Sequence, residues 1–510
     1  MVDAPDESHN AKGSSSNVVT LSDPKTSDSK TINNLPTELL IEIFTHALPV
    51  RKRRIVSRCI APLQLTHVCS RWRTIASQTT ILWTSLDLWG PSPSYTRSLR
   101  IPLRHWLARA SQRPVSLRFR MMDDSRRSGC AYFVHALDHV RELSLSMCRE
   151  HYEPLFDLGP GSMPLLESVT LCMRGSRRSA QVTRQGSINF GSCSALRKVV
   201  LHSSGSHVGF LSTDMVSNLP MEQLVFLTVH EVSLHPYAAL KHVVQCTNLE
   251  ECTLVLGAYG SREGPFPDLP SVVLERLRKL DITFSGKEAG GKISLFFQPL
   301  TMPSLISLEI TATMSSADLD LSSVLVGLHT RSMFPLRTFT LVNISVMRAP
   351  LRAFLHAVPS LRSLKLQSAP GSNHRYHTLF HWFRYDPSRA AQILPNLIDV
   401  FICDNVSNRF SKHDGHAVFI PFNLSDQLDD HTTLRALASR FWNSDNGSGL
   451  EEPGLRRLEK ATMRWRNVPV EWRSLARDVM LGVEYLRGEG LDVYLPLEEC
   501  RSRCVARFIV

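Results

Sequence analysis

Between residues 33 and 88, apolar positions recur with the period of an α-helix in two short runs. The first run predicts a helix that begins near Asn33 or Asn34, either of which can accept a hydrogen bond from a free helical N–H. Pro36 fits the first turn, where a missing N–H costs little, and Pro49 ends the helix. The apolar face of this predicted helix consists of Leu39, Leu40, Ile43, Phe44 and Ala47.

The second run predicts another helix, which begins at Pro62 and follows a basic segment at residues 51–54. Two such helices cannot bury both apolar faces against each other, because a unit of fewer than about 60 residues covers too little surface to be robust. We therefore expect a partner chain, or the rest of this chain, to cover what remains. The apolar stripe of the second helix consists of Leu65, Val68, Cys69, Trp72 and Ile75.

The order of residues in this stretch is Leu-Pro, a Leu pair, Ile-Phe, then Val-Cys-x-Arg-Trp-Arg and finally Leu82-Trp83. This order resembles the F-box, in the F-box-like form of fungi with a long link between its halves. The resemblance implies docking on the Skp-type adaptor of a cullin-based, SCF-type ubiquitin ligase. The alternative is an ordinary helical hairpin that happens to carry Leu-Pro. The adaptor-binding residues that the resemblance implies are Leu35, Pro36, Leu39, Leu40, Ile43, Phe44, Val68, Cys69, Trp72 and Trp83.

Further along the chain, the pattern Leu-x-x-Leu-x-Leu returns in one frame, with other apolar residues in some places. Successive starts are 25 to 36 residues apart, a mean of about 29 that is near the 20–29 residues of leucine-rich repeats. Shorter matches end at Leu88 and Phe119. The pattern resembles degenerate leucine-rich repeats. The units begin at Val140, Leu166, Leu196, Leu224, Leu249, Leu277, Leu305, Leu336, Leu361 and Leu397.

Each unit predicts a strand with alternate side chains buried on one face, followed by a return such as the helical segments at residues 237–246 and 349–358. Strand, return and strand at this period imply a parallel sheet with right-handed crossovers. The predicted fold class is therefore α/β: a short helical F-box followed by a curved solenoid with a parallel sheet. The alternative is an unrelated α/β domain with coincidental spacing. The expected core includes Leu280, Ile282, Leu308, Ile310, Leu364 and Leu366.

The organisation that these patterns predict has four parts: a disordered tail at residues 1–31, an F-box-like domain at 32–90, a solenoid at 91–470 and a C-terminal cap at 471–510. We expect a helix at residues 98–110 and a strand at 115–119 where the solenoid begins. A further unit is expected near Gly454, and the cap should hold a helix at residues 471–487 and a strand at 491–495.

The middle residue of each repeat strand points away from the buried face. In a curved solenoid this row lines the concave surface, where we expect a target protein to bind. Its mixture of Thr, acids, a lysine and an aromatic argues against nucleic acid, since phosphates favour an unbroken basic stripe. The alternative is that the target binds a loop or the C-terminal region. The row consists of Arg118, Ser144, Thr170, Val200, Thr228, Thr253, Asp281, Glu309, Thr340, Lys365 and Phe401.

The amino-acid composition restricts the possible functions of the chain only slightly. The net charge of +11 over 510 residues permits an acidic partner or nucleic acid without requiring either. The 11 cysteines lack CxxC spacing, so we expect reduced thiols in a cytoplasmic or nuclear protein. The polar first residues predict no secretory signal, and no apolar run is long enough to span a membrane.

Motifs for catalysis, cofactors or metals are weak. Residues 286–293 match a phosphate-binding loop up to Lys292, but Ile293 stands where Mg²⁺ needs Ser or Thr. His374, His377 and His381 could share a helix face, and Cys500 and Cys504 lie close in sequence, but neither group makes a complete zinc site. We expect no catalytic residue, no cofactor and no metal.

The sequence therefore predicts a non-catalytic specificity subunit of a ubiquitin ligase. It would hold an unknown target near the ubiquitin carrier, and proximity would raise the effective concentration. Two alternatives stay open at this point: a solenoid that binds nucleic acid or acts as a scaffold, and an enzyme that uses the loop at residues 286–293.

Overall fold

The computed structural model divides the chain into two compact units: Met1–Pro49 with Arg58–Thr79, and Val50–Ser57 with Thr80–Val510. The residues that the structure describes are 32–48, 61–90, 100–121, 130, 133–174, 186–203, 210–211, 215–231, 234–257, 271–285, 289–316, 321–344, 346, 348–368, 379, 382–383, 393–405, 409–413, 416–420, 458–466, 484–488 and 490–494.

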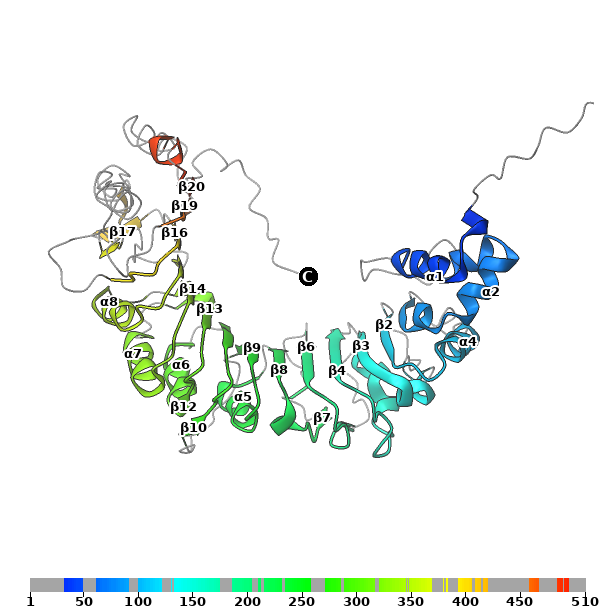
Figure 1. Cartoon of the computed structure of the whole chain (residues 1–510). Coiled ribbons are helices and arrows are strands. Elements are labelled where there is room, and N and C mark those ends of the chain that lie inside the picture. The colour runs from blue at the N-terminus through cyan, green and yellow to red at the C-terminus, as the bar shows by residue number, and fades with distance from the viewer. Residues whose placement is uncertain are drawn as a thin grey trace, which may run out of the picture. The chain divides into compact units, whose positions relative to one another are not determined.

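The first unit is helical. It contains α1 (Thr37–His46) and α2 (Ser70–Gln78), together with the short 3-10 helices η1 (Ile32–Asn34) and η2 (Gln64–His67) (Figure 1). Its core is small because each helix contributes only a few large side chains. The buried residues are Leu40, Phe44, Ala61, Pro62, Leu65, Thr66, Ile75 and Ala76.

Three details of these helices differ from the sequence prediction. Pro36, not Asn33 or Asn34, stands before α1, and it makes no side-chain cap. The helix predicted from Pro62 is interrupted because Cys69 has an extended backbone, with its sulfur accepting a hydrogen bond from the N–H of Trp72 at 3.4 Å. Since this thiol caps α2, the apolar stripe is divided between η2 and α2. The apolar face of α1 is also shorter than predicted, because Ala47 lies just after the helix and is exposed. Pro49 lies outside the described residues.

The second unit is built on one 14-stranded sheet in which each strand pairs in parallel with the next strand of the sheet. The sheet is curved and does not close (Figure 1). Every repeat predicted from the sequence forms a strand of this sheet, as do the two shorter upstream matches. The strands are β1 (Ser85–Gly90), β2 (Val115–Met121), β3 (Val140–Cys148), β4 (Ser168–Arg174), β6 (Lys198–Ser203), β8 (Phe226–Glu231), β9 (Glu251–Gly257), β11 (Lys279–Ser285), β13 (Ser307–Ser316), β14 (Thr338–Ile344), β15 (Ser363–Gln367), β16 (Asp399–Asn405), β19 (Lys460–Arg466) and β20 (Asp492–Tyr494).

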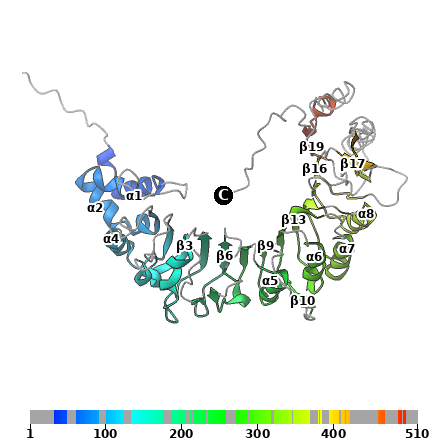
Figure 2. The same ribbon diagram turned by 180° about the vertical axis from the view of Figure 1, so that it is seen from behind.

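Helices and short turns connect these strands. From α5 to α8 the helices pack side by side along the outside of the curve, which leaves the opposite face of the sheet as its inner face (Figures 1 and 2). Among the described residues the longer α-helices are α4 (Arg100–Ala110), α5 (Pro236–Val243), α6 (Ala289–Phe297), α7 (Leu321–Ser332) and α8 (Arg348–Ala357). The 3-10 helices are η3 (Thr80–Trp83), η5 (Val134–His139), η6 (Arg149–Leu155) and η7 (Met221–Gln223).

Three two-stranded sheets accompany the main one. Two are parallel, β5 (Ile188–Asn189) with β7 (Val216–Ser217) and β10 (Val272–Val273) with β12 (Leu300–Thr301). The third is antiparallel and joins β17 (Arg409–His413) to β18 (His416–Ile420). All three lie outside the main sheet, so they leave the order of its strands unchanged.

The predicted core is confirmed. Leu280, Ile282, Leu308, Ile310, Leu364 and Leu366 are all buried. In β11 and β13 these residues are also direct neighbours in register, Leu280 with Leu308 and Ile282 with Ile310. Stacked apolar rows of this kind are what one buried face per repeat produces, because each unit is completed by its neighbours. The register deduced from the sequence is therefore correct.

The C-terminal part extends this sheet. The further unit expected near Gly454 is β19, which pairs with β16, and the expected last strand is β20, which pairs with β19. The described helix of this region covers only residues 484–488. A cap at residues 471–510 stays a prediction, since residues 467–483 and 495–510 lie outside the described part.

Candidate docking surface and target-binding face

The first unit exposes large apolar side chains. Leu39 and Ile43, one turn apart on α1, are 51% and 39% exposed, and Val68, between η2 and α2, is 56% exposed. Pro36 is exposed and Leu35 is half-buried. Large apolar side chains left in water indicate an interaction surface when they gather on so small a unit. These five residues are called the docking residues below.

The neighbouring positions of α1 point inward. Leu40 and Phe44 are fully buried, and the Phe44 ring lies 4.8 Å from that of Trp72. The apolar face predicted for α1 is thus two stripes, one that forms the core and one that is exposed. Leu40 and Phe44 can serve docking only by supporting the exposed stripe. Trp72 and Cys69 are half-buried at the edge of this core.

Two arginines hold the segments of the first unit together. The Arg71 guanidinium donates a hydrogen bond of 2.7 Å to the carbonyl oxygen of Leu35, which positions the chain just before α1. Arg73 Nε donates to the carbonyl oxygen of Thr66 at 2.8 Å and so joins α2 to η2. In the sequence these two arginines were visible only as part of the Val-Cys-x-Arg-Trp-Arg motif. Hydrogen bonds from these side chains to backbone carbonyls outside their own helix leave no periodic signal in the sequence that could have revealed them.

Trp83, the last residue of the motif, belongs to the second unit. It is fully buried in an edge-to-face contact with Trp106 at 4.8 Å, and the Arg109 guanidinium lies 4.4 Å from its ring centre. Trp106 Nε1 donates to the carbonyl oxygen of Trp83 at 2.7 Å. The ring therefore secures the start of the second unit to α4.

The row predicted to bind a target runs unbroken along the inner face. Each member is the register partner of the next, from Arg118 to Phe401, and Asp87 on β1 and Thr462 on β19 continue it at either end. Most members are half-buried, while Thr340 is buried. The geometry of the row is as predicted, and the binding role stays a prediction.

Residues two positions along each strand form a second row on the same face, which was not among the predicted target-binding residues. It includes Arg120, Ser146, Cys172, His202 and His230. The period of two that gave the first row could have identified it. The His202 and His230 rings lie 5.4 Å apart, and burial first, then the His202 charge, lowers the pKa of His230.

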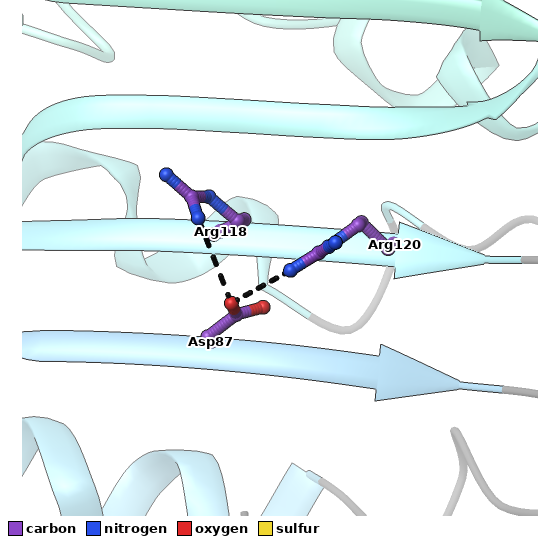
Figure 3. Close-up of polar contacts among 3 residues, drawn as sticks. All are labelled: Asp87, Arg118 and Arg120. Carbon is purple, nitrogen blue, oxygen red and sulfur yellow. Dashed lines mark hydrogen bonds and ion pairs between the residues drawn. The ribbon is translucent and has the colours of Figure 1, made fainter. Parts of the chain in front are cut away.

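Charges on the inner face are grouped. At one end, Asp87 Oδ2 accepts a 2.9 Å hydrogen bond from Arg120 Nη2 and lies 3.7 Å from Arg118 Nη1 (Figure 3). Two strands further, Arg174 Nε donates to Ser146 Oγ at 3.2 Å. We call Arg118, Arg120 and Arg174, with Asp87, the arginine end.

Carboxylates occupy the middle of the face. Asp281 and Glu309 are register partners on β11 and β13, and Lys279 Nζ lies 3.0 Å from Asp281 Oδ2. The hydrogen bond and charge of Asp281 raise the pKa of Lys279. Burial, followed by the charge of Asp281, raises the pKa of Glu309, which Lys365 and Lys279 oppose. Lys365 Nζ also lies 5.5 Å from the ring centre of Phe401.

The cysteines that the structure describes are all free thiols. Burial raises the pKa of Cys193 to about 11 and that of Cys246 to about 12, so these thiols carry no charge near neutral pH. Within the described residues, no three His, Cys, Asp or Glu side chains lie close enough to hold a metal. The candidates His374, His377, His381, Cys500 and Cys504 lie outside that part.

The loop weighed as a phosphate site is partly helical. Residues 289–292 form the first turn of α6, and Ile293, the next residue of the same helix, is fully buried. A loop was predicted for residues 286–293, and that prediction is wrong for residues 289–293, which are helical. A buried isoleucine here fills the core of the repeat, because α6 packs against β11 and β13.

The arrangement defines a class of protein: a small helical unit with exposed apolar side chains, joined to a repeat array with a long open face. A family model described as F-box-like matches residues 32–89, so the chain contains an F-box-like domain. No curated protein matches the chain. The leucine-rich-repeat resemblance of the remainder depends on the repeat pattern alone. Each helix in the described part of the chain is too short or too polar to cross a membrane.

Proposed function

We propose that this chain is the substrate-recognition subunit of an SCF-type cullin ubiquitin ligase. The F-box-like domain suggests an adaptor role of this kind. The first unit docks on a Skp-type adaptor, and the inner face of the second unit captures a target protein. The chain itself needs no catalytic group, since holding a lysine of the target near a charged ubiquitin raises the effective concentration.

The exposed apolar stripe of α1 is the observation that carries this proposal. Leu39 and Ile43 are exposed although the adjacent Leu40 and Phe44 complete the core. Burying such side chains at an interface contributes roughly 1.5–3 kcal/mol each. A partner chain that covers the docking residues therefore gains affinity without any change in the core of the first unit.

The inner face supports the second half of the proposal. It offers a continuous row of side chains from β1 to β19, most of them half-buried and polar or charged. Extended faces of repeat arrays are surfaces on which proteins are bound. The mixture of positive, negative, neutral and aromatic groups fits a protein segment better than a uniform phosphate backbone.

The test is co-purification of the full chain with a Skp-type adaptor. We expect the double variant Leu39→Asp and Ile43→Asp to lose adaptor binding by at least about 100-fold, because both apolar contacts are lost and charges are buried. The matched control carries Leu165→Asp and Val273→Asp, two exposed apolar residues of the second unit outside the F-box-like domain.

Circular dichroism establishes that both double variants are folded. Full adaptor binding by the folded Leu39 and Ile43 variant would disprove docking through α1. An equal loss of adaptor binding in the control would mean that the association is non-specific and does not depend on the docking residues.

A further inference from the structure

Two histidines lie side by side on the inner face of the sheet. His202 on β6 and His230 on β8 are register partners on adjacent parallel strands, so their side chains leave the same face. Their ring centres are 5.4 Å apart, and the ring planes are inclined by 51°. His202 is exposed and His230 is half-buried, so a ligand on the inner face can reach both rings.

The fold does not use the nitrogens of these two rings. Elsewhere, His235 has a structural task, because its Nδ1 accepts a hydrogen bond from the N–H of Tyr237 at the start of α5. In the part of the chain that the structure describes, neither the His202 ring nor the His230 ring makes a hydrogen bond or an ion pair. A neutral imidazole has one nitrogen with a free lone pair. Each ring therefore keeps a nitrogen that can bind a ligand.

The spacing of the two rings fits two ligands on one metal ion. Zinc binds imidazole nitrogen at about 2.0–2.1 Å, and two imidazoles on one tetrahedral zinc have ring centres roughly 5 Å apart. The observed separation of 5.4 Å is close to this distance. Rings stacked face to face could not direct their nitrogens at a common point, and the inclination of 51° avoids such stacking. Side-chain rotation alone would thus bring both nitrogens to one ion.

The neighbours of the pair define the class of metal. Cys172 on β4 and Val255 on β9 flank His202 and His230 in the second row, so no carboxylate adjoins them in register. Imidazole nitrogen suits zinc, copper and nickel, whereas magnesium and calcium prefer oxygen ligands. Cys172 does not complete the set, since no three candidate ligands of the described residues lie close enough to hold a metal. Two of four tetrahedral positions are therefore left to other groups.

We propose that His202 and His230 together bind a divalent transition-metal ion of the zinc class on the inner face. The remaining coordination positions of the ion are open to water or to a side chain of a bound protein. A His, Cys or carboxylate of a captured target is the chemistry that these positions accept. The metal site itself does not depend on the proposed function.

The test titrates Zn²⁺ into the purified full chain and measures the heat of binding. We expect His202→Gln and His230→Gln each to weaken zinc binding by at least about tenfold, because changes to groups behind a ligand already cost 10–100-fold. His202→Glu should keep most of the affinity, since a carboxylate is itself a zinc ligand. Excess Mg²⁺ should not compete for the site.

The matched control carries His105→Gln on α4 and His356→Gln on α8, two exposed histidines on separate helices. Its zinc affinity should equal that of the unchanged chain, and circular dichroism establishes that every variant is folded. Equal losses in the control and in His202→Gln, or no loss in His202→Gln and His230→Gln, would mean an adventitious ion only and would overturn the proposal. An equal loss in Cys172→Ala would overturn the assignment to two imidazoles.

Adaptor co-purification is measured on the same samples. Zinc binding without adaptor co-purification would count against the ligase role alone. Adaptor co-purification without zinc binding would count against the metal site alone.

Discussion

The two units of this chain specify their surfaces in different ways. In the first unit, single neighbouring side chains decide the surface: Leu40 is buried in the core, whereas Leu39 beside it is exposed. In the second unit, period two over many strands decides which residues face inward, and no single residue sets the pattern. A motif therefore identifies the first unit, whereas only regular spacing identifies the second.

The largest effect should come from charging the core of the sheet. We expect Leu308→Asp to destabilise the second unit by about 4 kcal/mol or more, because a buried unpaired carboxylate replaces a fully buried leucine. Thermal unfolding followed by circular dichroism measures this loss. Adaptor co-purification through the first unit should persist.

The control for that substitution is Thr311→Asp, a half-buried residue of the same strand on the inner face. Its unfolding temperature should be close to that of the unchanged chain. If the Leu308→Asp variant had the same unfolding temperature as the Thr311→Asp variant, burial of alternate side chains along β13 would not be the source of the sheet's stability.

The next effect concerns the first unit. Phe44→Ala removes a buried ring that packs on Trp72, and such truncations cost about 3–5 kcal/mol. We expect the first unit to unfold and adaptor binding to be lost, while the unfolding transition of the 14-stranded sheet stays unchanged. Hydrogen exchange resolves the two units separately.

Protection lost equally from both units in the Phe44→Ala variant would show that they unfold as one. The two units would then differ in how their sequences specify them, but they would not differ in stability.

The smallest effect should come from Glu309→Gln. The pKa of Glu309 is raised above 4.5, so its contribution to stability is fully present below pH 4.5 and is lost as the pH rises through the raised value. Removing the charge should therefore stabilise the protein slightly at pH 7, within the about 0.5 kcal/mol typical of surface positions. Below pH 4.5 the variant and the unchanged chain should unfold alike.

Unfolding temperatures between pH 4 and pH 8 test this prediction, and Glu222→Gln, in η7 outside the inner face, provides the control. A variant that was less stable at neutral pH would show that the Glu309 carboxylate makes a favourable contact.

Much of the second unit could be predicted because burial repeats. Leu-x-Leu cores gave the strands, their order and even the register of the row from Arg118 to Phe401. The positions at which a helix begins or is interrupted were not predicted where they do not depend on a periodic pattern of burial. The break at Cys69 depends on a thiol that caps α2, and α6 begins where two glycines and a near-miss motif pointed to a loop.

The candidate sites were predicted unevenly for a related reason. Sequence spacing places Leu39, Leu40, Ile43 and Phe44 on one broad helix face, but only packing decides which of them stay exposed. The arginine end was invisible because it joins Asp87, Arg118, Arg120 and Arg174 from three strands. Proximity of this kind follows from pairing across a sheet, which local sequence does not show.

The order of the main sheet also determines how such a chain can change in length. Each strand pairs only with the strand before it and the strand after it in the sheet, and that order follows the chain. Duplicating or deleting one strand with its return would alter a single junction and leave every other pair in place. The array can therefore grow or shrink by local edits, and the reach of its inner face changes by one strand width each time.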